Sequence, residues 1–140
     1  MLRVGTVGTS SIMRTIQEAI RLTDGMECRV VYSRTEEQGR AFAAEMGVPE
    51  HCTDYAAMLE RSDLDLIDIA SPNRFHVEQA LAALEHGKHV IVEKPAAVTR
   101  GDVQRLIDAA RANGVYFFEA ITTLFMPQYE ACRLLLPKLG

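Results

Sequence analysis

Short apolar runs alternate along the chain with segments in which apolar residues recur every three or four positions. The first such segment carries Ile12, Ile16 and Ile20, the spacing of one buried helix face. Gly47 and Gly87 follow later helical segments, as expected of residues that end a helix. Asn73 is expected to cap the fourth helix, and Thr99 and Asp102 have the spacing of a capping box at the start of the next one. A last helix is expected over residues 125–138. The apolar runs predict buried strands over residues 2–7, 26–33, 64–70, 89–93 and 115–119, with a short strand near residues 51–52.

This order, a strand followed by a helix about five times, predicts an α/β fold with a doubly wound parallel sheet. Strands joined through helices lie parallel, and right-handed crossovers place helices on both faces of the sheet. Ligands of such sheets bind beyond the carboxyl ends of the strands. We therefore expect the chemistry at residues 8–11, 33–34, 71–73, 93–95 and 119–121.

Composition narrows the function classes. The chain has 140 residues, 48% of them hydrophobic and 24% charged, which suits one globular domain. A net charge of −4 offers no basic field for nucleic acid or an anionic membrane. Cys28, Cys52 and Cys132 form no CxxC pair and show no metal-ligand spacing with the histidines, so we expect a reducing cytoplasmic location and no metal site. No apolar run is long enough for a membrane helix.

The turn after the first strand, VGTVGTSSIM at residues 4–13, is a candidate phosphate site. Only the first glycine of a GxGxxG pattern is present, because Ser10 and Met13 stand at the other two positions. A tight turn between strand and helix exposes backbone N–H groups that favour a phosphate. A glycine that merely turns the chain is the alternative.

The end of the second strand indicates which dinucleotide is preferred. An acid at this tip would hold the ribose hydroxyls of NAD, but the sequence here is Tyr32, Ser33, Arg34 and Thr35. Ser33 and Arg34 can hold a 2′-phosphate instead, which favours NADP(H) over NAD(H). A solvated surface arginine is the alternative interpretation.

Two stretches together resemble a known family. IASPNRFHVEQALAALEHGKHVIVEKPAAVT at residues 69–99, taken with the glycine turn, resembles the glucose–fructose oxidoreductase, inositol dehydrogenase and rhizopine-catabolism family (Gfo/Idh/MocA) of NAD(P)-dependent oxidoreductases. The segment Glu93-Lys94-Pro95 is its most specific marker, and the resemblance covers essentially the whole chain.

The resemblance implies an NAD(P)-binding Rossmann domain over residues 1–120. Lys94 would be the catalytic residue, at the end of a strand and next to the nicotinamide, and the peptide bond before Pro95 would be cis. His76 would lie at the cofactor edge, or serve only as a hydrogen-bond partner at the helix end. The implied cofactor-binding residues are Gly8, Thr9, Ser10, Ser11, Ile12, Ser33, Arg34, Ala70, Ser71, Pro72, Asn73, His76, Glu93 and Lys94.

Members of this family carry a second α/β domain that supplies most of the substrate pocket and commonly the oligomer interface. Residues 121–140 resemble the helix that leads to it, so we expect a chain that lacks this domain and does not turn over substrate by itself. The complete protein would act on a sugar or polyol and form a homo-oligomer. A non-catalytic dinucleotide-binding or sensing module is the alternative.

Overall fold

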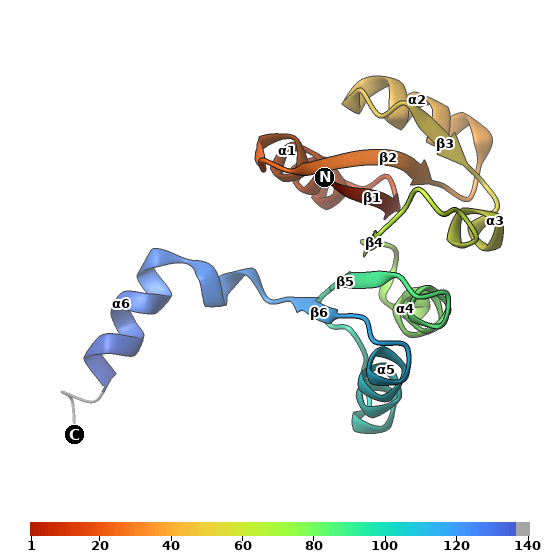
Figure 1. The fold of residues 1–140 in the computed structure, drawn as a ribbon. Helices are drawn as coiled ribbons and strands as arrows, with labels where there is room; N and C mark the ends of the chain where they lie inside the picture. Colours follow the sequence, from red (N-terminus) through yellow and green to blue (C-terminus); the bar gives the residue numbers. More distant parts are fainter. Residues whose placement is uncertain (137–140) are drawn as a thin grey trace.

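The computed structural model describes residues 1–136, and in these residues six parallel strands form one sheet (Figure 1). The strand order is β3-β2-β1-β4-β5-β6, with every neighbouring pair parallel. The predicted doubly wound parallel sheet is confirmed. The strands are β1 (Leu2–Val7), β2 (Met26–Tyr32), β3 (Glu50–Cys52), β4 (Leu66–Ile69), β5 (His89–Glu93) and β6 (Phe117–Ala120).

Helices cover the two faces of this sheet in separate groups (Figure 1). One face packs against α3, α4 and α5, through a core that contains Ile67, Leu84 and Leu106. The other face packs against α1 and α2, through Met13 and Phe42. The helices are α1 (Ser11–Leu22), α2 (Glu36–Met46), α3 (Tyr55–Leu59), α4 (His76–Glu85), α5 (Arg100–Ala112) and α6 (Pro127–Leu135), with 3-10 turns η1 (Asn73–Phe75) and η2 (Thr122–Phe125).

Local sequence sets several of the helix ends. The Thr99 hydroxyl accepts a hydrogen bond from the backbone N–H of Asp102 at 3.1 Å, which confirms the cap predicted there. Gly47 ends α2 in the left-handed conformation, as predicted. The expectation that Asn73 caps the fourth helix is wrong. Asn73 begins the 3-10 turn η1, and α4 starts only at His76.

The last described helix, α6, follows β6 and extends away from the sheet (Figure 1). It covers most of the helix expected over residues 125–138, whereas residues 137 and 138 of that prediction lie outside the described part of the chain. Within residues 1–136, no helix has both the length and the apolar character needed to span a bilayer.

Candidate functional site

The candidate site lies where β1 and β4 end side by side and their connections leave toward opposite faces of the sheet. The backbone N–H of Ala70 donates to the carbonyl of Val7 at 3.0 Å, and that of Gly8 donates to the carbonyl of Tyr32 at 3.0 Å. These bonds hold the ends of three strands together. Two pockets adjoin at this point, one toward β2 and one toward β5, with four residues in common: Ser10, Ala70, Ser71 and Pro72.

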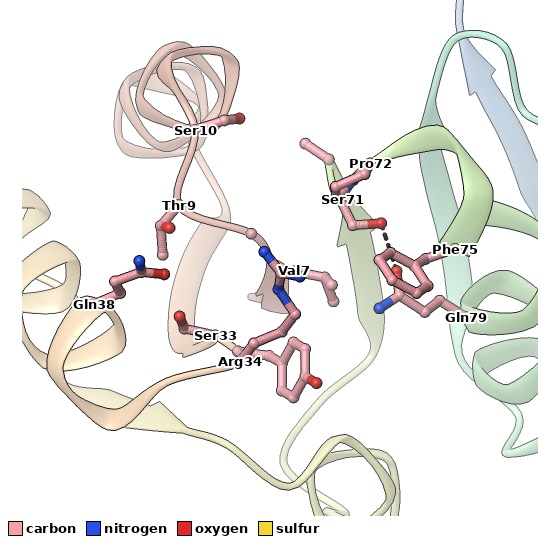
Figure 2. Close-up of a pocket in the computed structure, with 13 residues that line it drawn as sticks. Val7, Thr9, Ser10, Ser33, Arg34, Gln38, Ser71, Pro72, Phe75 and Gln79 are labelled. Atoms are coloured by element: carbon pink, nitrogen blue, oxygen red, sulfur yellow. Dashed lines mark hydrogen bonds between the residues drawn. The ribbon is translucent and has the colours of Figure 1, made fainter.

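The β2-side pocket is a cleft of about 220 Å³. Its walls come from the ends of β1, β2 and β4, from the turn before α4, and from α4 itself (Figure 2). The lining residues are Val7, Gly8, Thr9, Ser10, Tyr32, Ser33, Arg34, Gln38, Ala70, Ser71, Pro72, Phe75 and Gln79.

Gly8 brings the backbone into contact with the neighbouring strand end. Its φ of +115° lies outside the range that L side chains readily adopt, and an added Cβ would lie 2.8 Å from the carbonyl oxygen of Ala70. Two residues later, the side chain of Ser10 makes no capping bond to α1. The first-turn N–H groups of α1 have no partner within the helix, so this end of α1 favours an anion at the pocket wall.

The tip of β2 carries a cation and no acid. Arg34 is exposed and forms no ion pair with any of the described carboxylates, whereas the neighbouring Ser33 is buried. Glu36, the first acid after the strand, lies 2.7 Å from Nε2 of His51, and this hydrogen bond lowers the pKa of Glu36. Gln38 of α2 completes this corner of the pocket. The corner therefore suits a phosphate better than a ribose diol.

The β5-side pocket, of about 460 Å³, contains the predicted catalytic lysine. Lys94 is exposed and Glu93 is half-buried at the end of β5. The Lys94–Pro95 peptide bond is cis, as expected. The complete lining is Ser10, Ile12, Ala70, Ser71, Pro72, Asn73, Glu93, Lys94, Ala120 and Thr122.

His76 does not line either pocket. Its side chain has no exposed surface, Nδ1 lies 2.9 Å from the carbonyl oxygen of Pro95, and Nε2 lies 2.8 Å from that of Ser71. The structure therefore contradicts the expected position of His76 at the cofactor edge, because the ring is buried and each of its nitrogens lies next to a backbone carbonyl oxygen. His76 instead links the loop after β4 to the loop after β5, the second of the two roles considered for it.

A buried carboxyl group lies within β4, close enough to Glu93 for their charges to interact. Asp68 of β4 is 6% exposed, and its Oδ1 atom has no hydrogen-bond partner among the described residues. Burial, and to a lesser extent the nearby carboxylate of Glu93, raises the pKa of Asp68 to about 7. Sequence reasoning missed this group, since an acid inside an apolar strand has no distinctive spacing.

The structure brings nearly all the predicted site residues to the two pockets. Besides His76, Ser11 is the exception, because it is exposed at the start of α1 and lines neither pocket. Sequence reasoning missed Phe75 and Gln79. The spacing of four residues between Phe75 and Gln79 was an available signal, since such residues share one face of a helical segment. Val7, Tyr32, Gln38 and Thr122 were also missed, whereas Ala120 lies in the expected range 119–121.

Comparison with known families identifies this arrangement. The model of the Gfo/Idh/MocA oxidoreductase family, described as an NAD-binding Rossmann fold, matches residues 2–121. The chain belongs to this family. These residues are its NAD(P)-binding Rossmann domain, and the resemblance noted in the sequence is confirmed.

Two relatives show the range of the similarity. The NADP⁺-dependent scyllo-inositol 2-dehydrogenase IolU of Bacillus subtilis (strain 168) is 36% identical over 140 residues, which are 100% of this chain and 43% of the relative. The 1,5-anhydro-D-fructose reductase of Ensifer adhaerens is 39% identical over 116 residues, 82% of this chain and 34% of that protein. The chain thus spans less than half the length of these Gfo/Idh/MocA relatives.

Solved structures agree with the fold. The 3-ketoreductase KijD10 of Actinomadura kijaniata, in complex with NADP and TDP-benzene, superimposes with a TM-score of 0.92 at 30% identity, over 98% of this chain and 42% of that one. Biliverdin reductase of Synechocystis sp. PCC 6803, with biliverdin and NADP⁺, gives 0.89 at 30% identity, over 99% and 44%.

The groove of this Gfo/Idh/MocA domain fits a dinucleotide on its own geometry. Gly8 lets the turn after β1 pack against the backbone at the end of β4, and the uncapped start of α1 lies beside this turn. The pockets on either side share Ser10 and Ser71, so one extended ligand can pass from one to the other. Its phosphates would lie over the helix end, with one half of the ligand on each side of the β1–β4 junction.

Proposed function

We propose that this domain prefers NADP(H) and serves an oxidoreductase that transfers hydride between the nicotinamide and an alcohol or carbonyl carbon of a sugar, cyclitol or related polyol. One observation carries the proposal. The groove formed by the two pockets, where β1 and β4 end side by side, has at one end Arg34, which pairs with none of the described carboxylates, and at the other end Lys94. The substrate class rests on relatives that act on an inositol and on an anhydrofructose.

At the β2-side end, Arg34 and Ser33 would hold the 2′-phosphate. A guanidinium forms two parallel bonds to a phosphate, and the buried Ser33 hydroxyl adds a short, positioned donor. Gly8, Thr9, Ser10 and Ile12, which line the two pockets, would surround the pyrophosphate at the start of α1, as the resemblance implies.

At the β5-side end, Lys94 would act on the substrate. The bound cofactor supplies a carbon that gives or accepts hydride. Lys94 would hydrogen-bond the substrate oxygen and give or take its proton, while the neighbouring Glu93 orients the ammonium or holds the nicotinamide ribose. Ala70, Pro72 and Asn73 would form the opposite wall, where they line the same pocket.

A non-catalytic dinucleotide-binding or sensing module is the second candidate, because the family model covers only the NAD-binding part of such enzymes. Lys94 distinguishes the two, since a sensor needs no acid–base group beside the nicotinamide. In the complete oxidoreductase, replacement of Lys94 by alanine should abolish turnover and leave dinucleotide binding largely intact.

Cofactor preference can be tested on this chain directly. It contains no tryptophan, so the fluorescence of NADPH and NADH can be followed without interference. We expect saturable binding that favours NADPH. Arg34→Ala should weaken NADPH binding about 10- to 100-fold, because a charge-assisted bond to the phosphate is lost, and should affect NADH much less.

Arg40→Ala is the matched control, since Arg40 is an exposed arginine of α2 outside both pockets. It should leave both affinities close to those of the parent chain. Equal NADPH affinity in the parent chain and in Arg34→Ala would refute the assignment of Arg34. Failure of the folded chain to bind either dinucleotide would refute the proposed cofactor site.

Three further expectations belong to the complete protein. We propose that residues 1–120 form the cofactor domain and residues 121–140 a connecting segment, which the family match over residues 2–121 supports. We also propose a homo-oligomer that acts on small molecules. A cytoplasmic location is supported by Cys28, Cys52 and Cys132, which are all free thiols.

A further inference from the structure

Gln79 of α4 lines the β2-side pocket and was not among the predicted site residues. Its carboxamide oxygen accepts a hydrogen bond of 2.6 Å from the hydroxyl of Ser71. Figure 2 shows the nitrogen of the same carboxamide turned away from Ser71, toward the side of the pocket where Arg34 lies. One end of this amide is thus held by the protein, and the other end is directed into the cleft.

The surroundings hold the backbone of both Gln79 and Ser71 in place. The hydroxyl of Tyr55 donates to the backbone carbonyl of Gln79 at 2.8 Å, and the ring of Tyr55 packs against that of Tyr32 with centroids 5.3 Å apart. On the other side, the carbonyl of Ser71 lies 2.8 Å from Nε2 of the fully buried His76. Both partners of the Ser71–Gln79 bond are therefore anchored, which is the arrangement expected of a recognition group rather than of a mobile surface glutamine.

The rest of this pocket has the shape and chemistry for a flat aromatic base. Arg34 offers a planar guanidinium on one side, and Pro72 and Phe75 offer apolar surface on the other (Figure 2). The phosphate positions are accounted for by the start of α1 and by the tip of β2. The part of a dinucleotide left for the space next to Gln79 is its base.

We propose that Gln79 recognises the adenine base of the cofactor at the edge that carries the 6-amino group, an inference that rests on the proposed NADP(H) site. A glutamine amide is complementary to this edge, because it donates to a ring nitrogen and accepts from the amino group. The carboxamide oxygen has two lone pairs, so it can accept from Ser71 and from the base together. Ser71 acts as the positioning residue that fixes which end of the amide faces the ligand.

Base discrimination separates recognition from a merely structural bond between Ser71 and Gln79. The probes are NADPH and its hypoxanthine analogue, in which a carbonyl replaces the 6-amino group. The chain should bind NADPH about 5- to 100-fold more tightly than the analogue, the range for a bidentate contact to a base. Gln79→Met, which keeps the length of the side chain, should bring this ratio close to unity. Ser71→Ala should reduce the ratio as well, because the amide loses its orientation.

Gln38→Met is the matched control, since Gln38 lines the same pocket at its phosphate corner. It should change the affinity for both dinucleotides by the same factor and leave their ratio as in the parent chain. Circular dichroism of each variant establishes that it is folded. Equal affinity of the parent chain for both dinucleotides, or an unchanged ratio in folded Gln79→Met, would overturn the role of Gln79. Absence of binding to both dinucleotides in the parent chain would instead refute the proposed function itself.

Discussion

At the scale of single residues, the buried carboxyl of Asp68 makes folding depend on pH. Burial raises its pKa to about 7 in the folded chain, far above the usual value of an aspartate. Between about pH 4 and pH 7 the folded state therefore holds a proton that the unfolded chain has released. The free energy of unfolding must fall as the pH rises through this window, because ionisation is easier in the unfolded state.

We predict that Asp68→Asn removes this dependence. At about pH 8 the variant should be more stable than the parent chain by about 1–3 kcal/mol, and near pH 4 the gain should vanish. Urea unfolding followed by circular dichroism at several pH values measures the difference. Asp24→Asn, at an exposed carboxyl, is the control and should show no such gain. A constant stability difference at all pH values would show that Asp68 does not titrate in this range.

Carboxylates that are hydrogen-bonded to arginine have a lowered pKa. They therefore change the free energy of unfolding with the opposite sign from Asp68, and at lower pH. The hydrogen bond from Arg61 lowers the pKa of Asp63 to about 2, and that from Arg3 lowers the pKa of Asp65 further. Their contributions are present above about pH 4 and are lost only in stronger acid. Both pairs are partly exposed, so each contribution is small. Between about pH 4 and pH 7, the effect of Asp68 on the free energy of unfolding can therefore be measured separately from theirs.

At the scale of elements, Lys88 joins the segments that enter β4 and β5. The side chain is 8% exposed, and its ammonium donates to the carbonyl of Arg61 at 2.6 Å and to that of Leu64 at 3.0 Å. These carbonyls belong to the segment between α3 and β4, at the end of the sheet opposite the cofactor groove. Lys88 is thus a structural lysine, whereas Lys94 is exposed in the groove.

Replacement of Lys88 by methionine should lower the free energy of unfolding by about 1–3 kcal/mol, because two buried carbonyls lose a charged donor. Arg111→Met removes an exposed cation from α5 and should change stability by about 0.5 kcal/mol or less. Thermal and urea unfolding measure both effects. Dinucleotide affinity should be unchanged in Lys88→Met, since the site lies at the other end of the strands. A Lys88→Met chain as stable as its parent would contradict this assignment.

At the scale of the whole molecule, apolar side chains are exposed from β6 to the last described helix. Phe125 is 87% exposed, and Leu134, Leu135 and Leu136 are 59%, 52% and 65% exposed. Tyr116 and Phe118 add an aromatic pair on the edge of the sheet, with centroids 6.0 Å apart. Exposed apolar surface that continues over neighbouring elements favours association between molecules.

We predict that the chain self-associates as its concentration rises into the micromolar range. Leu134→Glu together with Leu135→Lys should shift it toward the monomer, because both charges would be buried in a contact made by α6. Leu22→Ser removes a side chain that is 75% exposed at the end of α1 and should leave association unchanged. Sedimentation velocity distinguishes these cases. A parent chain that stays monomeric throughout would contradict the prediction.

Sequence by itself determined the features that depend on neighbouring residues. Alternation of short apolar runs with helical spacing was enough for the parallel sheet, because the central strands β1 and β4 are largely buried and each helix from α1 to α5 has buried residues on one face. Thr99 and Asp102, three positions apart, were enough to predict where α5 begins. The segments around Gly8, Arg34 and Lys94 marked the cofactor groove, because the carboxyl ends of parallel strands meet at one edge of the sheet.

Only the tertiary structure decided the features that depend on distant residues. The sequence left His76 open between two roles, and contacts with carbonyls five and nineteen positions away assigned it to the protein interior. Asp68 reads as an ordinary strand residue until burial and Glu93 raise its pKa. Gln79 became part of the pocket because Ser71 and Tyr55 hold it there. Burial and hydrogen-bond partners arise from the packing of separate segments, and spacing along one segment does not encode them.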